Sequence, residues 1–122
     1  MTTYSGSCHC GRVTLEINTT IERITLCDCS VCTKKGVVHV GVPDDDFQLL
    51  GGEADLSLYQ FGSGDARHWF CSHCGIHTHG RPRSDPSRYT VNARCLDAYD
   101  EIMAKVPVRN FDGKNHPKDR GV

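Results

Sequence analysis

The spacing of the cysteines constrains this chain of 122 residues more than any other feature. Two pairs, Cys8/Cys10 and Cys71/Cys74, are each followed at once by a glycine, which lets the backbone curl so that its amides face the sulfurs. Zinc is often held in structural sites by four thiolates in a tetrahedron. The two pairs therefore predict one four-cysteine zinc site, which closes a loop of about 60 residues and removes much conformational entropy from the unfolded chain.

A second cluster consists of Cys27, Cys29 and Cys32, three thiols within six residues. They are enough to hold one metal ion from one side, and a helical turn that begins at Ser30 would favour their thiolate forms. The local sequence supplies no fourth ligand. Water, a substrate or a distant residue are the three alternatives, and an open position distinguishes a catalytic zinc from a structural one.

The remaining cysteine and several histidines bear on that fourth position. For Cys95 we favour a buried thiol without a metal; the alternative makes it the fourth ligand and closes the site. His77 and His79 lie on one face of an expected strand and could approach a metal, although a packed role is commoner. His9 and His73 stand between cysteines, and we expect their side chains to point outward.

Several classes of protein are disfavoured by what the sequence lacks. The net charge of -1 includes no basic stripe, so we expect no nucleic-acid partner. The N-terminus shows no signal peptide, and no segment approaches the ~18 apolar residues of a membrane helix. We therefore expect a cytoplasmic protein without a membrane partner, in a compartment that disfavours disulfides. The sequence leaves the oligomeric state open.

Short segments of alternating or β-branched residues, separated by turn residues, predict a mainly β domain that spans residues 1–122. Helical turns are expected only after Ser30 and at 96–103. The tail, 110–122, is expected to be a loop with a frayed end. The predicted strands are 12–17, 24–26, 37–42, 47–50, 56–61, 66–70, 75–79, 89–93 and 106–108.

Three cysteine motifs in a fixed order carry a resemblance to a known family. They are Gly6-Ser7-Cys8-His9-Cys10-Gly11, Cys27-Asp28-Cys29-Ser30-Val31-Cys32 and Phe70-Cys71-Ser72-His73-Cys74-Gly75. The chain resembles the glutathione-dependent formaldehyde-activating enzymes. The later segments 81–84 and 91–97 are most similar to the branch that includes centromere protein V.

The resemblance implies a tent-like assembly of short antiparallel sheets, braced by zinc on cysteines. It implies two zinc ions per chain: a structural one on Cys8, Cys10, Cys71 and Cys74, and one on the cluster at 27–32 whose free position accepts a thiol. The implied reaction joins glutathione to formaldehyde and is classed with the carbon–sulfur lyases. The chain departs from the family in being shorter than the named enzyme, and in carrying His116 where family tails often have a tryptophan.

Glutathione, the small-molecule partner that the resemblance implies, carries two carboxylates, so its site would need cations. The cations that we expect around it are Lys34, Lys35, Arg81, Arg83 and Arg94. The metal on Cys27, Cys29 and Cys32 would bind and deprotonate the thiol, which then adds to the aldehyde carbon. The alternative is a zinc-binding module without catalysis, which binds a protein partner and in which both metals only brace loops.

Overall fold

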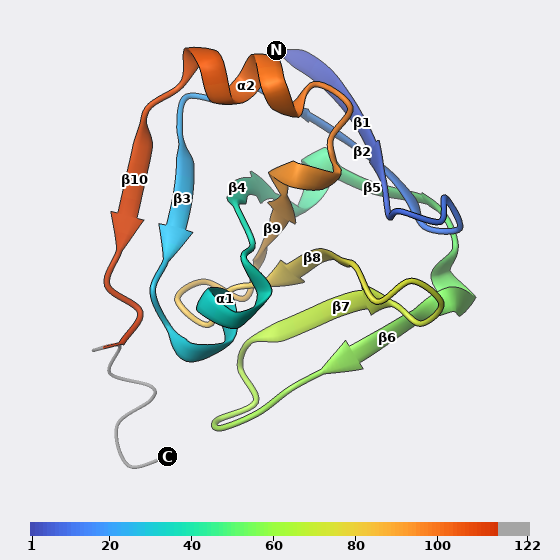
Figure 1. The fold of residues 1–122 in the computed structure, drawn as a ribbon, viewed down its shortest axis with the longest axis vertical. Coiled ribbons are helices and arrows are strands. Elements are labelled where there is room, and N and C mark those ends of the chain that lie inside the picture. The colour runs from blue at the N-terminus through green and yellow to red at the C-terminus, as the bar shows by residue number, and fades with distance from the viewer. Residues whose placement is uncertain (115–122) are drawn as a thin grey trace.

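The computed structural model describes residues 1–114 and consists mainly of short strands (Figure 1). The strands are β1 (Thr2–Ser7), β2 (Thr14–Thr19), β3 (Ile24–Cys27), β4 (His39–Pro43), β5 (Phe47–Gly51), β6 (Leu56–Tyr59), β7 (Arg67–Cys71), β8 (His77–Arg81), β9 (Arg88–Asn92) and β10 (Val108–Phe111). Two helices, α1 (Ser30–Lys35) and α2 (Tyr99–Lys105), and the 3₁₀ turns Asp44–Asp46, Glu53–Asp55 and Ala93–Cys95 complete the described part. None of its helices is long and apolar enough to cross a membrane.

The strands form two sheets, one of three strands in the order β1-β2-β5 and one of seven in the order β10-β3-β4-β9-β8-β7-β6. The pairs are antiparallel except β3 and β10, which run parallel. The main core lies between the sheets and under α2, and its members are apolar. In β2, Leu15 and Ile17 are fully buried, as the alternation of this segment predicts.

The predicted fold class, mainly β with short sheets, is confirmed, and three details differ from the expectation. Strand β1 was not predicted, because Thr2–Ser7 is polar and buries only Gly6. Strand β10 pairs in parallel and extends through Phe111, into the segment expected to be loop. Helix α2 begins at Tyr99, because Ala93–Cys95 forms a separate 3₁₀ turn. The expected frayed end lies in 115–122, outside the described residues.

His79 on β8 is buried in an aromatic cluster between the two sheets. Its ring lies 4.7 Å from that of Phe47 and 5.1 Å from that of Trp69, centroid to centroid. Its Nδ1 is 2.8 Å from the hydroxyl of Thr78. Burial lowers the pKa of His79 to about 4, with a smaller effect from Arg81. This imidazole is therefore a neutral packing group, which is the commoner of the two roles that the sequence left open for it.

The lowered pKa of His79 makes the stability of the fold depend on pH. Between pH 6.5 and about 4 the unfolded chain binds a proton at this residue that the folded protein does not, so stability is lost as the pH falls through this range. Between pH 7 and pH 5, we expect the free energy of unfolding to fall by about 1–2 kcal/mol more in the wild-type protein than in the His79→Phe variant. Urea unfolding of both proteins at both pH values measures the difference, and parallel losses would contradict it.

Candidate metal centres and the adjoining cavity

The sulfurs of Cys8, Cys10, Cys71 and Cys74 all lie within 4.8 Å of one another. Cys8 and Cys10 lie in the turn after β1, whereas Cys71 ends β7 and Cys74 lies in the turn that follows it. These two regions approach each other at the right of Figure 1. Cys8 and Cys71 are buried, whereas Cys10 is exposed. Sγ–Sγ distances of 3.6 Å join Cys10 to Cys8 and to Cys71. The structure thus brings the two distant pairs together as one four-sulfur group.

Backbone N–H groups donate to sulfurs of this group and favour the thiolate forms of Cys10 and Cys74. The N–H of Val13 donates to Cys8 Sγ at 3.4 Å. Hydrogen bonds from the backbone N–H groups of Cys10 and Ile76 lower the pKa of Cys74 to about 6. The pKa of Cys10 is lowered by the backbone N–H and then by the side chain of Arg12. His9 and His73 are exposed, as predicted, and His73 Nε2 lies 2.8 Å from a carboxylate oxygen of Asp55.

The second group consists of Cys27, Cys29 and Cys32, the cysteine triad, whose sulfurs also lie within 4.8 Å of one another. Cys27 ends β3, Cys29 immediately precedes α1, and Cys32 lies in its first turn. Hydrogen bonds from the thiols of Cys27 and Cys32 lower the pKa of Cys29 far below its ordinary value, and Arg83 contributes. The pKa values of the other two thiols are raised in turn. A thiolate at Cys29 therefore opposes ionisation of its two neighbours, and a bound cation would relieve that repulsion.

The chain segment after β10 is fastened over the triad by hydrogen bonds. A carboxylate oxygen of Asp28 accepts the backbone N–H groups of Gly113 at 2.8 Å and of Lys114 at 3.0 Å. The guanidinium of Arg83 donates to the Gly113 carbonyl at 2.8 Å. Gly113 itself is buried, and a Cβ at this position would overlap the sulfur of Cys27 and lie 2.8 Å from Cys29 Cβ. Only glycine fits between this segment and the triad.

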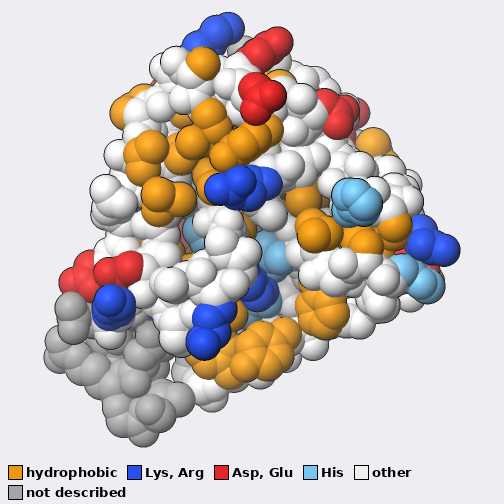
Figure 2. All heavy atoms as spheres, viewed as in Figure 1, with side chains coloured by type: hydrophobic (Ala, Val, Ile, Leu, Met, Phe, Trp, Pro, Cys, Tyr) orange, Lys and Arg blue, Asp and Glu red, His pale blue; other side chains and the backbone are white. Residues whose placement is uncertain are grey.

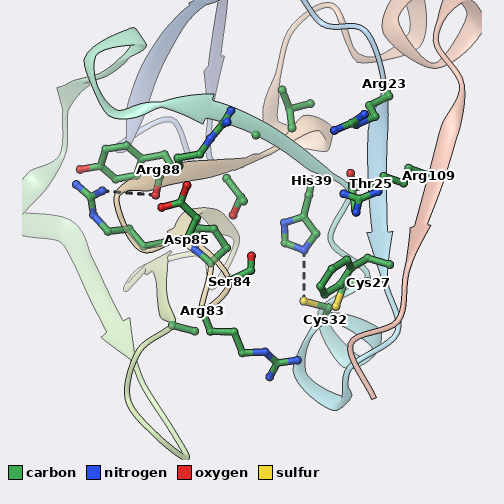
Figure 3. Close-up of a pocket in the computed structure, with 18 of the residues that line it drawn as sticks. Arg23, Thr25, Cys27, Cys32, His39, Arg83, Ser84, Asp85, Arg88 and Arg109 are labelled. Atoms are coloured by element: carbon green, nitrogen blue, oxygen red, sulfur yellow. Dashed lines mark hydrogen bonds between the residues drawn. The ribbon is translucent and has the colours of Figure 1, made fainter. Parts of the chain in front are cut away.

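A cavity of about 700 Å³ opens beside the triad, and all three cysteines line it. Figure 3 shows Cys27, Cys32 and His39 at one end, with Arg23, Arg83 and Arg109 nearby. The volume falls in the range of sites for small molecules. The two carboxylate residues among its lining are Glu22 and Asp85. The arginines that line it are Arg23, Arg81, Arg83, Arg88 and Arg109.

The structure divides the five cations that we expected around glutathione. Arg81 and Arg83 line the cavity beside the triad, but Arg81 is paired with Asp44 at 2.6 Å and lies over the ring of Tyr89. Lys34 is exposed and lines neither described cavity. Lys35 and Arg94 line a second cavity instead, so the structure does not bring them together with Arg81 and Arg83.

This second cavity, of about 590 Å³, also contains Cys95 and His77. Cys95 is buried and donates to the backbone carbonyl of His77 at 3.5 Å, and burial raises its pKa to about 12. His77 Nδ1 lies 3.0 Å from the Lys35 ammonium. Neither side chain belongs to a cysteine group, so neither occupies the fourth position of the triad. In Figure 2, histidine and Lys or Arg side chains surround a hollow near the middle of one face.

Sequence reasoning missed the histidine that contacts a triad sulfur, as well as Arg23 and Arg109 in the cavity. His39 on β4 places its Nε2 3.3 Å from Cys32 Sγ (Figure 3). Burial lowers its pKa to about 4, so the imidazole is neutral. The alternation of the run 37–42 would have placed His39 on the face opposite Val38 and Val40. It does not show that this face meets the triad, because that depends on the pairing of β3 with β4.

Both cysteine groups fit a metal ion of the zinc type. Four or three sulfurs within 4.8 Å of one another suit a soft thiolate site, and no disulfide joins cysteines among the described residues. The fold and the two groups define a small β protein built around cysteine clusters that could hold metal ions.

Comparison with known proteins identifies the family. Residues 3–111 match the family described as "Glutathione-dependent formaldehyde-activating enzyme". The crystal structure of a Rhodobacter sphaeroides protein has a similar fold, with a TM-score of 0.77 and 37% sequence identity; the match covers 86% of this chain and 99% of that one. The chain therefore belongs to the glutathione-dependent formaldehyde-activating enzyme family, as its cysteine motifs indicate.

The close approach of Gly113 to the triad can be tested by adding one methyl group. We expect Gly113→Ala to lower the free energy of unfolding by about 1–3 kcal/mol, because its Cβ overlaps Cys27 Sγ and the segment must shift. The displaced segment should also make Cys27 react faster with iodoacetamide, measured by peptide mass spectrometry. Gly41→Ala is the control, because its Cβ would meet only the Arg88 side chain, at 3.8 Å. Equal behaviour of the two variants would contradict the packing described.

Proposed function

We propose that this protein joins a small thiol to formaldehyde, with glutathione as the thiol and S-hydroxymethylglutathione as the product. This is the reaction of a carbon–sulfur lyase. One observation carries the proposal: three cysteine sulfurs, grouped without a fourth ligand from residues 1–114, line a cavity large enough for a small molecule. Membership of a family named for glutathione and formaldehyde supports the choice of substrates.

The proposal includes two zinc ions per chain with different roles. The ion on Cys8, Cys10, Cys71 and Cys74 is structural, because four protein ligands complete a tetrahedron. The triad holds the other and leaves one position for the substrate. When bound there, zinc would turn an incoming thiol into a thiolate, which is the nucleophilic form. The cytoplasm, where thiols stay reduced and glutathione is abundant, is the proposed compartment.

The residues around the cavity would bind and orient the thiol. Arg23 and Arg109 lie on the side of Cys27, where they could pair with the two carboxylates of glutathione (Figure 3). Glu22 or Asp85 could face its ammonium group. In the reaction a carbon–sulfur bond forms between the thiol sulfur and the aldehyde carbon, and the thiol proton ends on the former carbonyl oxygen. The chain contributes mainly by holding the sulfur in place.

The proposed reaction can be followed directly by exchange spectroscopy. We expect zinc-loaded protein to accelerate the exchange of ¹³C-formaldehyde with its glutathione adduct above the rate in buffer. Cys29→Ser should abolish the acceleration and remove about one of two zinc ions per chain. The matched control is Cys95→Ser, which changes a buried cysteine outside both groups and should keep both the activity and the metal. A rate equal to that in buffer would exclude the reaction for this substrate.

The role of the arginines gives a separate test of the substrate. We expect the double variant Arg23→Gln, Arg109→Gln to raise the KM for glutathione about tenfold, because two charge-assisted contacts are lost, with little change in kcat. The increase should shrink at high salt.

Arg67→Gln is the control for this charge effect, because Arg67 is exposed on β7 and does not line the cavity. An equal rise in KM for the control, or a fall in kcat alone for the double variant, would show that the two arginines do not bind the carboxylates.

A further inference from the structure

His39 is the one histidine of the described residues whose ring nitrogen is in hydrogen-bonding contact with a triad sulfur. Strand pairing fixes its position: in the central part of the large sheet it is opposite Thr25 of β3 and Asn92 of β9. Thr25 precedes Cys27 by two residues on β3. The backbone that carries the imidazole is therefore held by the same strand that carries the first sulfur of the triad.

The two nitrogens of His39 have different surroundings. Nε2 lies 3.3 Å from Cys32 Sγ, within hydrogen-bonding distance for sulfur. Nδ1 is buried and has no hydrogen-bond partner among residues 1–114. A proton on Nδ1, whether in the other neutral tautomer or in the cation, would be a buried N–H without a partner. A buried N–H without a partner is rarer and costlier than a buried acceptor without one, so the proton belongs on Nε2.

This tautomer argues against His39 as a metal ligand. A histidine that binds a metal through Nε2 carries its proton on Nδ1, and that N–H almost always donates to a carboxylate, a carbonyl or water. No protein group receives it here among the described residues. Moreover, the three sulfurs lie within 4.8 Å of one another, whereas no ring nitrogen of His39 comes that close to all three. The contact is therefore an N–H···S hydrogen bond to the sulfur.

We propose that His39 is a positioning residue of the triad, which donates its Nε2–H to Cys32 Sγ and draws negative charge away from that sulfur. With less charge donated by Cys32, a bound metal attracts a fourth thiolate more strongly. Three thiolates already give Zn²⁺ a net charge of -1, which opposes the approach of another anion. The hydrogen bond thus favours uptake of a thiol while leaving the fourth position open. The inference rests on the metal-binding part of the proposed function and not on the identity of the thiol.

Cobalt(II) in place of zinc gives a signal that reports on the sulfur itself. The spectrum of the triad is the difference between wild type and Cys29→Ser, each loaded with cobalt. We expect His39→Leu to move the sulfur-to-cobalt charge-transfer band to lower energy, because the sulfur loses its hydrogen bond, and to weaken metal binding about 10- to 100-fold. His39→Gln, which keeps an N–H donor, should restore most of both properties.

The matched control is His68→Leu, since His68 is a buried imidazole that lines the same cavity and has an unpartnered Nε2. It should leave the band in place. Cobalt bound at the four-cysteine group shows that each variant is folded. An unchanged charge-transfer band in His39→Leu would overturn the inference. A change in the visible d–d bands that His39→Gln does not restore would also overturn it, because this result would identify His39 as a ligand. Failure of wild type to bind cobalt at the triad would overturn the metal-binding proposal as well.

Discussion

The close approach of cysteine sulfurs in two groups is the constraint on which this small protein depends. Sulfurs within 4.8 Å of one another repel when they are charged, so a cation at either group would relieve that repulsion. The four-cysteine group also links two parts of the chain where little apolar material is available: the cluster there consists of Cys8, Val13 and Cys71, with a few partly buried neighbours. A metal cross-link at this point would stand in for a larger core.

Local patterns in the sequence predict what depends on near neighbours. The strands that alternate, such as β2, and the two cysteine groups follow from spacing alone, although joining Cys8/Cys10 to Cys71/Cys74 also needs the chemistry of zinc. Local patterns do not predict strand β1, because its residues are polar and it lies at a sheet edge. Local patterns also do not predict the parallel pairing of β10 with β3, because it joins residues more than eighty positions apart.

The surroundings of the triad were harder to predict than the triad itself. Arg23 and Arg109 reach the cavity because β3 and β10 are neighbours, and His39 reaches Cys32 because β4 pairs with β3. Each depends on strand register. Lys35, although it lies only three residues from Cys32, faces the second cavity, where it contacts His77. Proximity in sequence to a cysteine of the triad therefore says little about which cavity a side chain enters.

The attachment of Gly113 to Asp28 has a consequence for how the protein is made. The three sulfurs of the triad leave the ribosome early and within six residues, so they can capture a metal ion before most of the sheet exists. The segment that covers these sulfurs follows β10 and is held by hydrogen bonds to Asp28, so it requires residues that are synthesised much later. In a nascent chain that ends before Gly113, a metal bound by the triad would be exposed to the solvent and to competing thiols.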